Sequence, residues 1–459
     1  MPSLIKYLPA NVKNLARSNP VAIRYIVDGL LAVCAVNIAS SNFNLFAVRL
    51  GANDFQLSLV QFLPHIFTLL VLIPGGLFMD SLHNKKRIVI VMMLVVMFGY
   101  FLCAVSPFAS AYSIHFFLGS LALAGSAVAL YNIAWQSFFP SVVNINTRNQ
   151  VLTLRTRVTL IIGMITPVLV GAVLTRIGSV NNKIIAHQAF FISAVLLFLL
   201  AVLNFRRFRT TRQRALQAAE QQAASVKRIT LSEIKNAGKS LLHNKQFLLF
   251  AVTALFFHMT WHFDWTLYFI GQVHYLQMNE FQLGLVGLGA AAIQLLTLKF
   301  WSRKNERHGV VLPFTFGILG LSLCPVFMIV SVSLPLSLGP HLFILFHTFA
   351  HIPFCVVTLN LFQCILLVVD TQYRSFYMSV FASLLCLSNA VMPVAGVALY
   401  HSLGGDLNGF RYTFAIIFAL RIIAAAFWLL WWKHHSSVNH SKMPRHAEEP
   451  CSSTDSNCD

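Results

Sequence analysis

The stretch FFHMTWHFDWTLYF, residues 256–269, brings acidic, imidazole and indole side chains together inside an otherwise apolar segment. Side chains on a helix advance by about 100° per residue. On an unbroken helix, one arc would therefore carry His258, Trp261, His262, Trp265 and Tyr268. Asp264 lies near the edge of this arc, where a carboxyl group beside imidazoles can carry a proton or pair with a cationic solute. We predict Asp264, His258 and His262 as coupling residues that bind protons. The alternative for Asp264 is a structural hydrogen bond between helices.

Three other apolar segments carry polar side chains at helical spacing: NIASSNFN (37–44), YNIAWQ (131–136) and LFHTFAH (345–351). Polar groups inside apolar helices are costly to bury, which makes them candidates for a functional cavity. Together with the stretch above, they predict a substrate cavity lined by Asn37, Ser41, Asn44, Asn132, Trp135, Trp261, Trp265, His347 and His351. For each Asn and Ser, a hydrogen bond between packed helices is the alternative.

Two further patterns have simpler interpretations. His347 and His351 have the i, i+4 spacing that can share a zinc ion, but Cys355 lies about 12 Å along the helix axis from His347. We therefore expect no metal site. Arg24 and Asp28 are also i, i+4, and we expect them to pair, although Asp28 is a further candidate for a coupling role. Arg421 lies inside the last apolar segment, and the sequence indicates no partner for it.

The composition indicates the environment of these side chains. The 459 residues are 57% hydrophobic and only 10% charged, with a mean hydropathy of +0.71, whereas soluble domains carry roughly 25% charged residues. An integral membrane protein follows, and lipid requires its spans to be helices. Twelve transmembrane helices are predicted, over residues 22–48, 55–79, 88–107, 111–139, 155–175, 185–205, 246–272, 281–300, 310–332, 338–369, 375–400 and 411–432.

The basic residues predict the orientation. With both termini in the cytoplasm, 28 of the 33 Lys and Arg residues fall in cytoplasmic segments. This distribution accounts for the net charge of +19 without a nucleic-acid partner and favours contact with anionic membrane lipids. The N-terminal segment does not resemble a signal peptide, and no glycosylation acceptor falls in an outer loop. These features favour a bacterial protein of the cytoplasmic membrane.

A repeat divides the chain into two halves. NDFQLSLV at 53–60 returns as NEFQLGLV at 279–286, an offset of 226 residues, and Pro167 and Pro393 match at the same offset. Each copy of the phrase leads from an outer loop into the second span of its half, with Asn suited to cap the helix. Six spans per half give two parallel pseudo-repeats.

The loop after the second span carries a recognisable motif, GGLFMDSLHNKKRI at 75–88. It resembles the signature loop of the major facilitator superfamily, with Gly76, Asp80 and Lys85 at the matching glycine, acidic and basic positions. Phe78, Ser81, His83 and Asn84 depart from that pattern. The resemblance implies an all-α fold of two six-helix bundles and a conformational latch formed by Gly76, Asp80, Lys85 and Arg87. It also implies that spans 1, 4, 7 and 10 line a central cavity.

Four regions are expected along the chain. Residues 1–204 would form the N-terminal bundle, 205–245 a basic cytoplasmic linker with an amphipathic helix, 246–436 the C-terminal bundle, and 437–459 a disordered cytoplasmic tail.

The resemblance implies a secondary active transporter that moves a small organic molecule by alternating access. No phosphate-binding loop, nucleophile–base pair or complete metal site is present in the sequence, so we expect no enzyme activity and no cofactor. We favour proton-coupled efflux by a monomer, with protons as the coupling ion. Drug exporters of this family carry an Arg in span 4 where this chain has Leu121, which keeps uptake by proton symport open. A receptor without transport activity is the remaining alternative.

Overall fold

The computed structural model of the chain describes residues 20–41, 43–81, 85–139, 145–208, 231–369 and 373–442. In these residues the fold is almost entirely helical. The first half, called the N-half, contains α2 (Pro20–Ser40), α3 (Phe43–Arg49), α4 (Asp54–Ser81), α5 (Lys85–Val105), η2 (Ser106–Tyr112), α6 (Ser113–Phe138), α7 (Ile145–Thr175) and α8 (Val180–Arg206). The linker contributes α10 (Leu231–His243). The C-half contains α11 (Lys245–His262), α12 (Trp265–Ile270), the π-helix η4 (Gly271–Tyr275), α13 (Glu280–His308), α14 (Val311–Leu321), α15 (Cys324–Val332), α16 (Gly339–Leu366), α17 (Arg374–Ser402) and α18 (Leu407–Lys442).

The predicted twelve crossings are confirmed. Eleven segments are long and apolar enough to cross a membrane, and one of them, Lys86–Asn132, covers both α5 and α6. Three crossings are interrupted: α2/α3, α11/α12 and α14/α15 are each two helices separated by a short break. Many large apolar side chains on the outer faces are exposed, such as Leu70 at 64% and Leu296 at 76%, as lipid-facing helices require.

The two copies of the repeated phrase begin their helices in the same way. In the first copy, Oδ1 of Asn53 accepts a hydrogen bond from the Gln56 amide at 2.8 Å, and the Gln56 side chain accepts one from the Asn53 amide at 3.0 Å. Asn279 and Gln282 form the same reciprocal capping box at the start of α13. The predicted N-cap role of both asparagines is confirmed.

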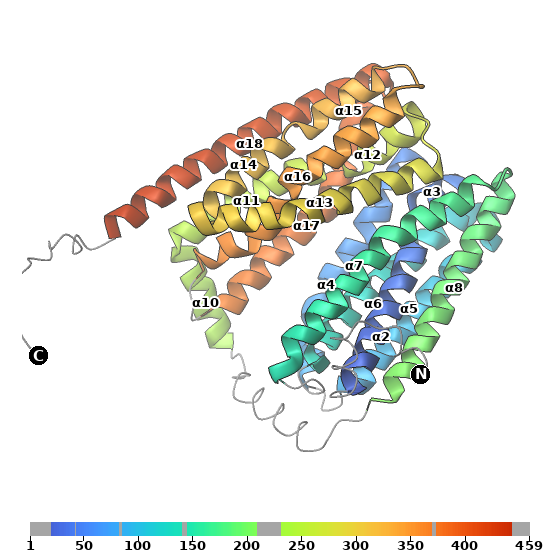
Figure 1. Cartoon of the computed structure of the whole chain (residues 1–459), viewed down its shortest axis with the longest axis horizontal. Coiled ribbons are helices and arrows are strands. Elements are labelled where there is room, and N and C mark those ends of the chain that lie inside the picture. The colour runs from blue at the N-terminus through green and yellow to red at the C-terminus, as the bar shows by residue number, and fades with distance from the viewer. Residues whose placement is uncertain are drawn as a thin grey trace, which may run out of the picture.

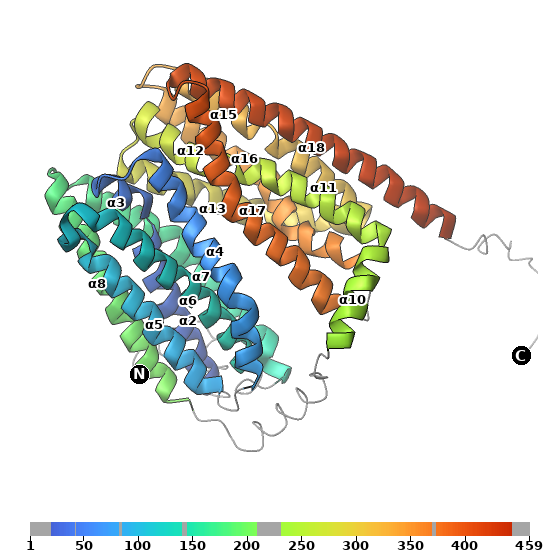
Figure 2. The same cartoon turned by 180° about the vertical axis from the view of Figure 1, so that it is seen from behind.

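The halves form two bundles that lean together at one end and diverge toward the other (Figure 1). We call the end with α3, α12 and the start of α13 the closed end. The opposite end, where α8 stops and α10 lies, is called the linker end; the view from behind shows the same arrangement (Figure 2). The α7–α13 and α4–α17 pairs carry the main packing between the halves.

The hydrophobic core supports this description. One cluster contains most of the N-half core together with C-half residues near the closed end, including Met278 and Val286. A second cluster is confined to the part of the C-half nearer the linker end, around Phe250 and Trp428. The apolar core is therefore continuous between the halves at the closed end.

Some predicted boundaries shift. Helix α7 begins at Ile145 rather than at residue 155, and α18 continues to Lys442, past the boundary predicted at 436. Residues 209–230 of the linker and 443–459 of the tail lie outside the described residues. Gly76 and Asp80 lie in the last turns of α4 and Lys85 begins α5, but their side chains are outside the described set, as are residues 82–84. The predicted latch therefore stays a prediction.

Candidate functional site

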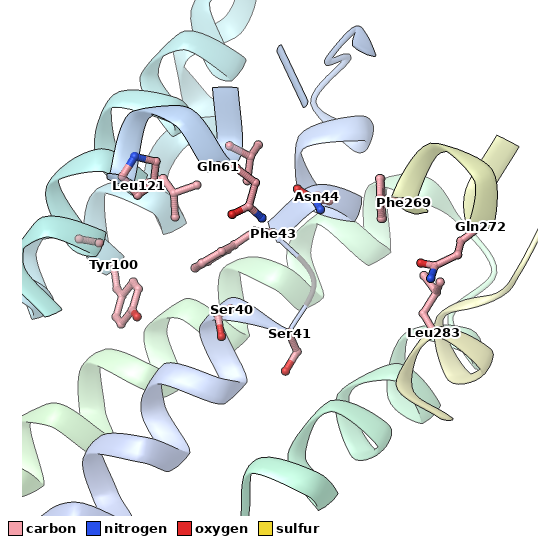
Figure 3. Close-up of a pocket in the computed structure, with 14 residues that line it drawn as sticks. Ser40, Ser41, Phe43, Asn44, Gln61, Tyr100, Leu121, Phe269, Gln272 and Leu283 are labelled. Atoms are coloured by element: carbon pink, nitrogen blue, oxygen red, sulfur yellow. The ribbon is translucent and has the colours of Figure 1, made fainter. Parts of the chain in front are cut away.

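Two cavities lie where the halves meet. The first, called the amide cavity, has a volume of about 330 Å³ and is built mainly by the N-half. Ser40 at the end of α2, Ser41 after it and Asn44 of α3 line this cavity. Gln272 of η4 and Leu283 of α13 face it from the C-half (Figure 3). Its polar lining is uncharged.

The second cavity, called the aromatic cavity, has a volume of about 350 Å³ and is built mainly by the C-half. Its principal lining residues are Trp261, Asp264, Trp265, Tyr268, His347, His351, Phe354 and Arg421. Gln61 of α4 lines this cavity and the amide cavity, so a single N-half side chain marks the junction between the two. Both volumes fall within the range of small-molecule sites.

The ring-bearing residues of the aromatic cavity form a connected series. The Tyr268 ring lies 6.3 Å from His347, which lies 4.6 Å from His351, centroid to centroid. From His351 the series continues to Phe354 at 4.9 Å, then to Trp261 at 5.2 Å. Trp265 ends it, 6.4 Å from Trp261 in a T-shaped arrangement. This series of rings connects span 7 with span 10, two of the helices that the resemblance implied would line a central cavity.

Asp264 forms a buried ion pair in the wall of this cavity. Its Oδ2 lies 2.6 Å from the guanidinium Nη2 of Arg421, and the two side chains are 0% and 1% exposed. Arg421 is thus the partner that the sequence did not indicate, and it reaches Asp264 from α18. The Oδ1 atom of Asp264 is buried without a hydrogen-bond partner.

The same arginine satisfies broken helix ends. Its guanidinium donates hydrogen bonds to the carbonyls of Thr260 and Trp261, at the end of α11, and to that of Leu321, at the end of α14. The last carbonyls of a helix have no partner within it, so these bonds stabilise the interruptions in spans 7 and 9. Gly396 of α17 lies against the Phe263 carbonyl so closely that a Cβ would overlap it.

Span 7 presents only part of the predicted arc to the aromatic cavity. Trp261, Trp265 and Tyr268 line the aromatic cavity, but His258 and His262 do not. His258 is buried, and its Nδ1 bonds to the Ala254 carbonyl at 2.8 Å. His262 lies against α17, with Nδ1 3.0 Å from the Ser388 hydroxyl. The rings nevertheless stay in contact, because His262 lies 5.6 Å from His258 and 4.7 Å from Trp265, centroid to centroid. The coupling roles of His258 and His262 stay predictions.

A second buried acid lies in the N-half. Asp28 of α2 is fully buried, and Tyr131 of α6 donates a hydrogen bond to its Oδ2 at 3.4 Å. The Arg155 guanidinium carbon lies 3.4 Å from the Trp135 ring centroid and 5.5 Å from that of Tyr25. Among the described side chains, no basic group lies within the 4.0 Å ion-pair distance of Asp28. Oδ1 of Asp28, Nε1 of Trp135 and Nε of Arg155 are buried without hydrogen-bond partners.

The expected pairing of Arg24 with Asp28 is wrong. Arg24 instead donates to the Arg207 carbonyl at 2.6 Å, and Asn204 donates to the Arg24 carbonyl at 2.8 Å. The Arg24 guanidinium thus connects the start of α2 to the end of α8. An i, i+4 spacing permits a pair on one helix, but a neighbouring helix end offers carbonyls that an arginine satisfies equally well.

The other predicted cavity residues divide in two groups. Ser41 and Asn44 line the amide cavity, and Trp261, Trp265, His347 and His351 line the aromatic cavity. Asn37, Asn132 and Trp135 line neither cavity. Asn37 donates to the Val33 carbonyl within its own helix at 2.8 Å, and Trp135 stacks on Tyr25.

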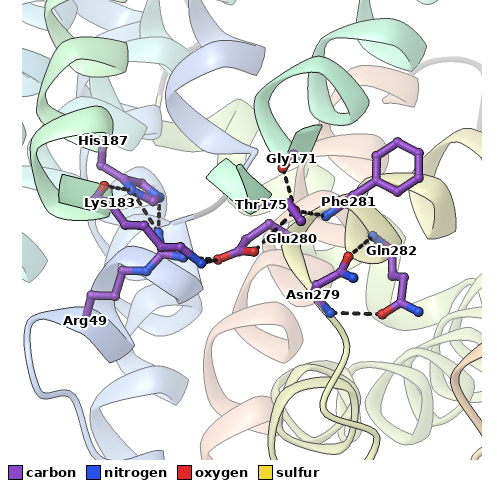
Figure 4. Close-up of polar contacts among 9 residues, drawn as sticks. All are labelled: Arg49, Gly171, Thr175, Lys183, His187, Asn279, Glu280, Phe281 and Gln282. Carbon is purple, nitrogen blue, oxygen red and sulfur yellow. Dashed lines mark hydrogen bonds and ion pairs between the residues drawn. The ribbon is translucent and has the colours of Figure 1, made fainter. Parts of the chain in front are cut away.

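The closed end is held by one carboxylate (Figure 4). Glu280, the acid in the second copy of the repeated phrase, pairs with Arg49 of α3 and with Lys183 of α8, the latter at 2.6 Å. Thr175 at the end of α7 lies 3.4 Å from its Oε2 and accepts a hydrogen bond from the Phe281 amide at 3.0 Å. A Cβ at Gly171 would overlap the Glu280 carbonyl, so glycine is what lets α7 approach α13 here.

The first copy of the phrase makes the related contact. Asp54 Oδ2 lies 3.2 Å from Nε2 of His401 at the end of α17, an ion pair when that imidazole is protonated. Positions 175 and 401 are also 226 residues apart. Each acid of the repeat therefore contacts the end of the fifth span of the opposite half, and both contacts join the halves.

Sequence reasoning missed several residues of the site. Gln61 lines both cavities but lies in span 2, for which no cavity role was predicted, and Gln272 and Phe354 lie in spans 7 and 10 beyond the polar positions that were selected. The intramembrane position of Arg421 was the available signal for that residue, since a charge there requires a partner or a function. Asp54 and Glu280 were given no role beyond their place in the repeated phrase, although an acid retained in both copies of a repeat fits a role at the interface.

Comparisons with known proteins agree with this architecture. The family model described as Major Facilitator Superfamily matches residues 29–362, and the chain belongs to this family. A search of curated proteins finds no match. As a member of the family, the chain is a multi-pass membrane transporter rather than an enzyme.

Solved structures share the fold at low sequence identity. A bacterial homologue of the iron transporter ferroportin in an inward-facing state is 12% identical, with a TM-score of 0.70 over 90% of this chain and 98% of that chain. The nucleoside transporter NupG is 13% identical, with a TM-score of 0.62 over 90% and 99%. A D-xylose–proton symporter is 12% identical, with a TM-score of 0.65 over 89% and 96%. Such likenesses describe the fold and not the substrate.

Proposed function

We propose that the chain is a secondary active transporter of a small organic molecule in the cytoplasmic membrane, working by alternating access and driven by protons. The observation that carries this proposal is the placement of both cavities. Each is built mainly by one half and completed by residues of the other, so movement of one bundle against the other changes access to both.

The closed end suits the outer gate of such a cycle. Glu280 crosses between the halves to Arg49 and Lys183, and Asp54 crosses to His401. The predicted excess of basic residues on the cytoplasmic side supports an outer position for this end, and the described conformation is then inward-open. In the opposite state the Glu280 contacts must break, and Gly76, Asp80, Lys85 and Arg87 would then latch the linker end.

Of the predicted coupling residues, Asp28 fits proton binding best. It is fully buried and has no ion-pair partner among the described side chains, so gain or loss of a proton changes the charge of its site. Asp264 instead holds Arg421 at 2.6 Å, and proton binding there would break an ion pair that also organises two helix ends. His258 and His262 are each engaged in a hydrogen bond.

The test is flux in proteoliposomes with an imposed proton gradient. Candidate solutes are loaded and their movement is followed with and without a protonophore. Proton-coupled efflux predicts that the solute and the protons cross the membrane in opposite directions. It also predicts that solute movement stops when the proton gradient collapses. Movement in the same direction as protons assigns uptake symport instead. Flux that ignores the protonophore would exclude proton coupling, and binding without flux would favour a receptor.

A further inference from the structure

The aromatic cavity contains no free charge for a solute to meet. Asp264 and Arg421 are the charged residues among its described lining, and they neutralise each other at 2.6 Å. Three further N–H groups of Arg421 donate to backbone carbonyls. A charged solute would lose its hydration without gaining a counter-charge, and that loss is costly in a buried site.

The cavity does offer flat surfaces. The arc from Tyr268 through His347, His351 and Phe354 to Trp261 and Trp265 presents successive rings to one space. Planar aromatic solutes stack on such rings, and base–aromatic stacking contributes about 1–3 kcal/mol per base in proteins that bind nucleic-acid bases.

The edge of the cavity offers both donors and acceptors. Nδ1 of His351 donates to the His347 carbonyl at 2.8 Å, which leaves Nε2 as an acceptor in the neutral ring. Nδ1 of His347 and Oδ1 of Asp264 are buried without partners. The Gln61 side chain supplies an amide that can donate and accept, and it makes no hydrogen bond to the described part of the chain. These groups match a solute whose rim alternates donors and acceptors.

We propose that the aromatic cavity binds an uncharged, flat nitrogen heterocycle, with its faces between the rings and its edge on Gln61 and the imidazoles of His347 and His351. This rests on the proposed function, because it names the substrate class of the same transporter. Neutral aromatic solutes gain stacking and hydrogen bonds there. A charged analogue loses its hydration without gaining a counter-charge, and a non-planar analogue cannot stack on the rings.

The experiment uses probes matched in size and different in charge or flatness. Purified full-length protein in detergent is titrated with nicotinamide, hypoxanthine and adenosine as neutral heterocycles. Nicotinate and AMP supply anionic counterparts, 1-methylnicotinamide a cationic one, and cyclohexanecarboxamide a neutral counterpart without an aromatic ring. Binding is read from tryptophan fluorescence and from the shift in thermal unfolding.

At least one neutral heterocycle is expected to bind about tenfold or more tightly than its charged and non-aromatic counterparts. Trp261→Leu and His347→Ala should each weaken this binding by about tenfold, while Trp432→Leu and His308→Ala, outside the cavity, leave it unchanged. An unchanged thermal unfolding midpoint for the cavity variants shows that they fold. Binding by no neutral heterocycle overturns the proposal, as does tighter binding of the cation or of the anions.

The outcome is separable from the test of transport. If proteoliposomes carry another solute while no heterocycle binds, the substrate class is wrong and transport stands. If a heterocycle binds through Trp261 and His347 but no flux follows, the binding site stands and the proposed transport activity is wrong.

Discussion

The two halves share a scaffold but bury an acid in different ways. In the C-half, Asp264 and Arg421 form a direct pair between spans 7 and 12 that also satisfies the ends of α11 and α14. In the N-half, Asp28 and Arg155 lie in the same polar cluster, but the arginine stacks on Trp135 instead of pairing within 4.0 Å. Each acid keeps one oxygen without a hydrogen-bond partner, but Asp264 is neutralised by a direct ion pair, whereas Asp28 has none among the described side chains.

The closed end repeats this asymmetry. Glu280 pairs with two bases and is 9% exposed, whereas Asp54 meets one histidine whose side chain is 52% exposed. At the repeated phrase the duplicated scaffold supplies two equivalent acidic positions, and the stronger ion pairs lie at Glu280 rather than at Asp54. Asp28 and Asp264 are not equivalent, since the 226-residue offset matches Asp28 with Ala254 and Asp264 with Ile38. The comparison teaches that the C-half supplies fixed charge, while the N-half supplies groups that can change partner.

Loss of the Arg421 charge should have the largest effect. Arg421→Met leaves Asp264 as a buried carboxylate without compensation, and breaking a buried pair in this way costs about 3–5 kcal/mol. The thermal unfolding midpoint in detergent should fall markedly, and the double variant Asp264→Asn with Arg421→Met should recover much of the loss. The matched change Arg155→Met in the N-half should cost less. Equal losses for the two arginines would contradict the distinction between the halves.

Neutralising the acids should separate coupling from structure. Asp28→Asn should reduce proton-driven accumulation to background in proteoliposomes while substrate exchange across equal proton concentrations continues. The asparagine keeps the size of the side chain and removes only its ability to carry a proton. Asp264→Asn should lower stability first, since it leaves Arg421 unpaired. If Asp28→Asn accumulates substrate like the parent protein, Asp28 is not the coupling residue.

The strong contact at the closed end should bias the conformational equilibrium. Glu280→Gln removes the charge shared by Arg49 and Lys183, and charge-assisted hydrogen bonds contribute about 1–3 kcal/mol. We expect more frequent opening of that end, measured as faster labelling of a Ser41→Cys reporter by an impermeant maleimide in a background without native cysteines. A labelling rate equal to that of the parent background would show that Glu280 does not hold the closed end.

The weak contact should matter least. Asp54→Asn removes a pair with the exposed His401, and such pairs contribute about 0–1 kcal/mol. In the same labelling assay the rate should change less than for Glu280→Gln. An increase in the labelling rate as large as that of Glu280→Gln would show that Asp54 and Glu280 stabilise the closed end equally.

Much of the architecture follows from the order of residues. Apolar runs predict twelve crossings, because in lipid each spanning segment must satisfy its own backbone hydrogen bonds as a helix. Asn53 and Asn279 predict two helix starts, because an N-cap bonds to a residue three positions further on. The polar stripes found Ser41, Trp261 and His347, which do line the cavities.

The remaining features depend on contacts that the local sequence does not encode. The break in span 7 contains no proline or glycine, and it is stabilised by Gly396 and Arg421 from other helices. The local pattern therefore predicted an unbroken helix through this stretch, with His262 as a coupling residue beside Asp264. The pairing of Arg24 failed for a similar reason, since its carbonyl acceptor at Arg207 lies 183 residues away.

By itself the sequence determined the class of protein, the number of crossings, the duplication and the segments that carry polar groups, because each depends on composition or on spacing along one helix. The tertiary structure decided that Asp264 meets Arg421 across 157 residues, that Gln61 joins the two cavities, and that the repeated acids cross between the halves. The physical reason is that ion pairs and cavity walls are set by which helix faces meet, and helix packing brings together side chains that are distant along the chain.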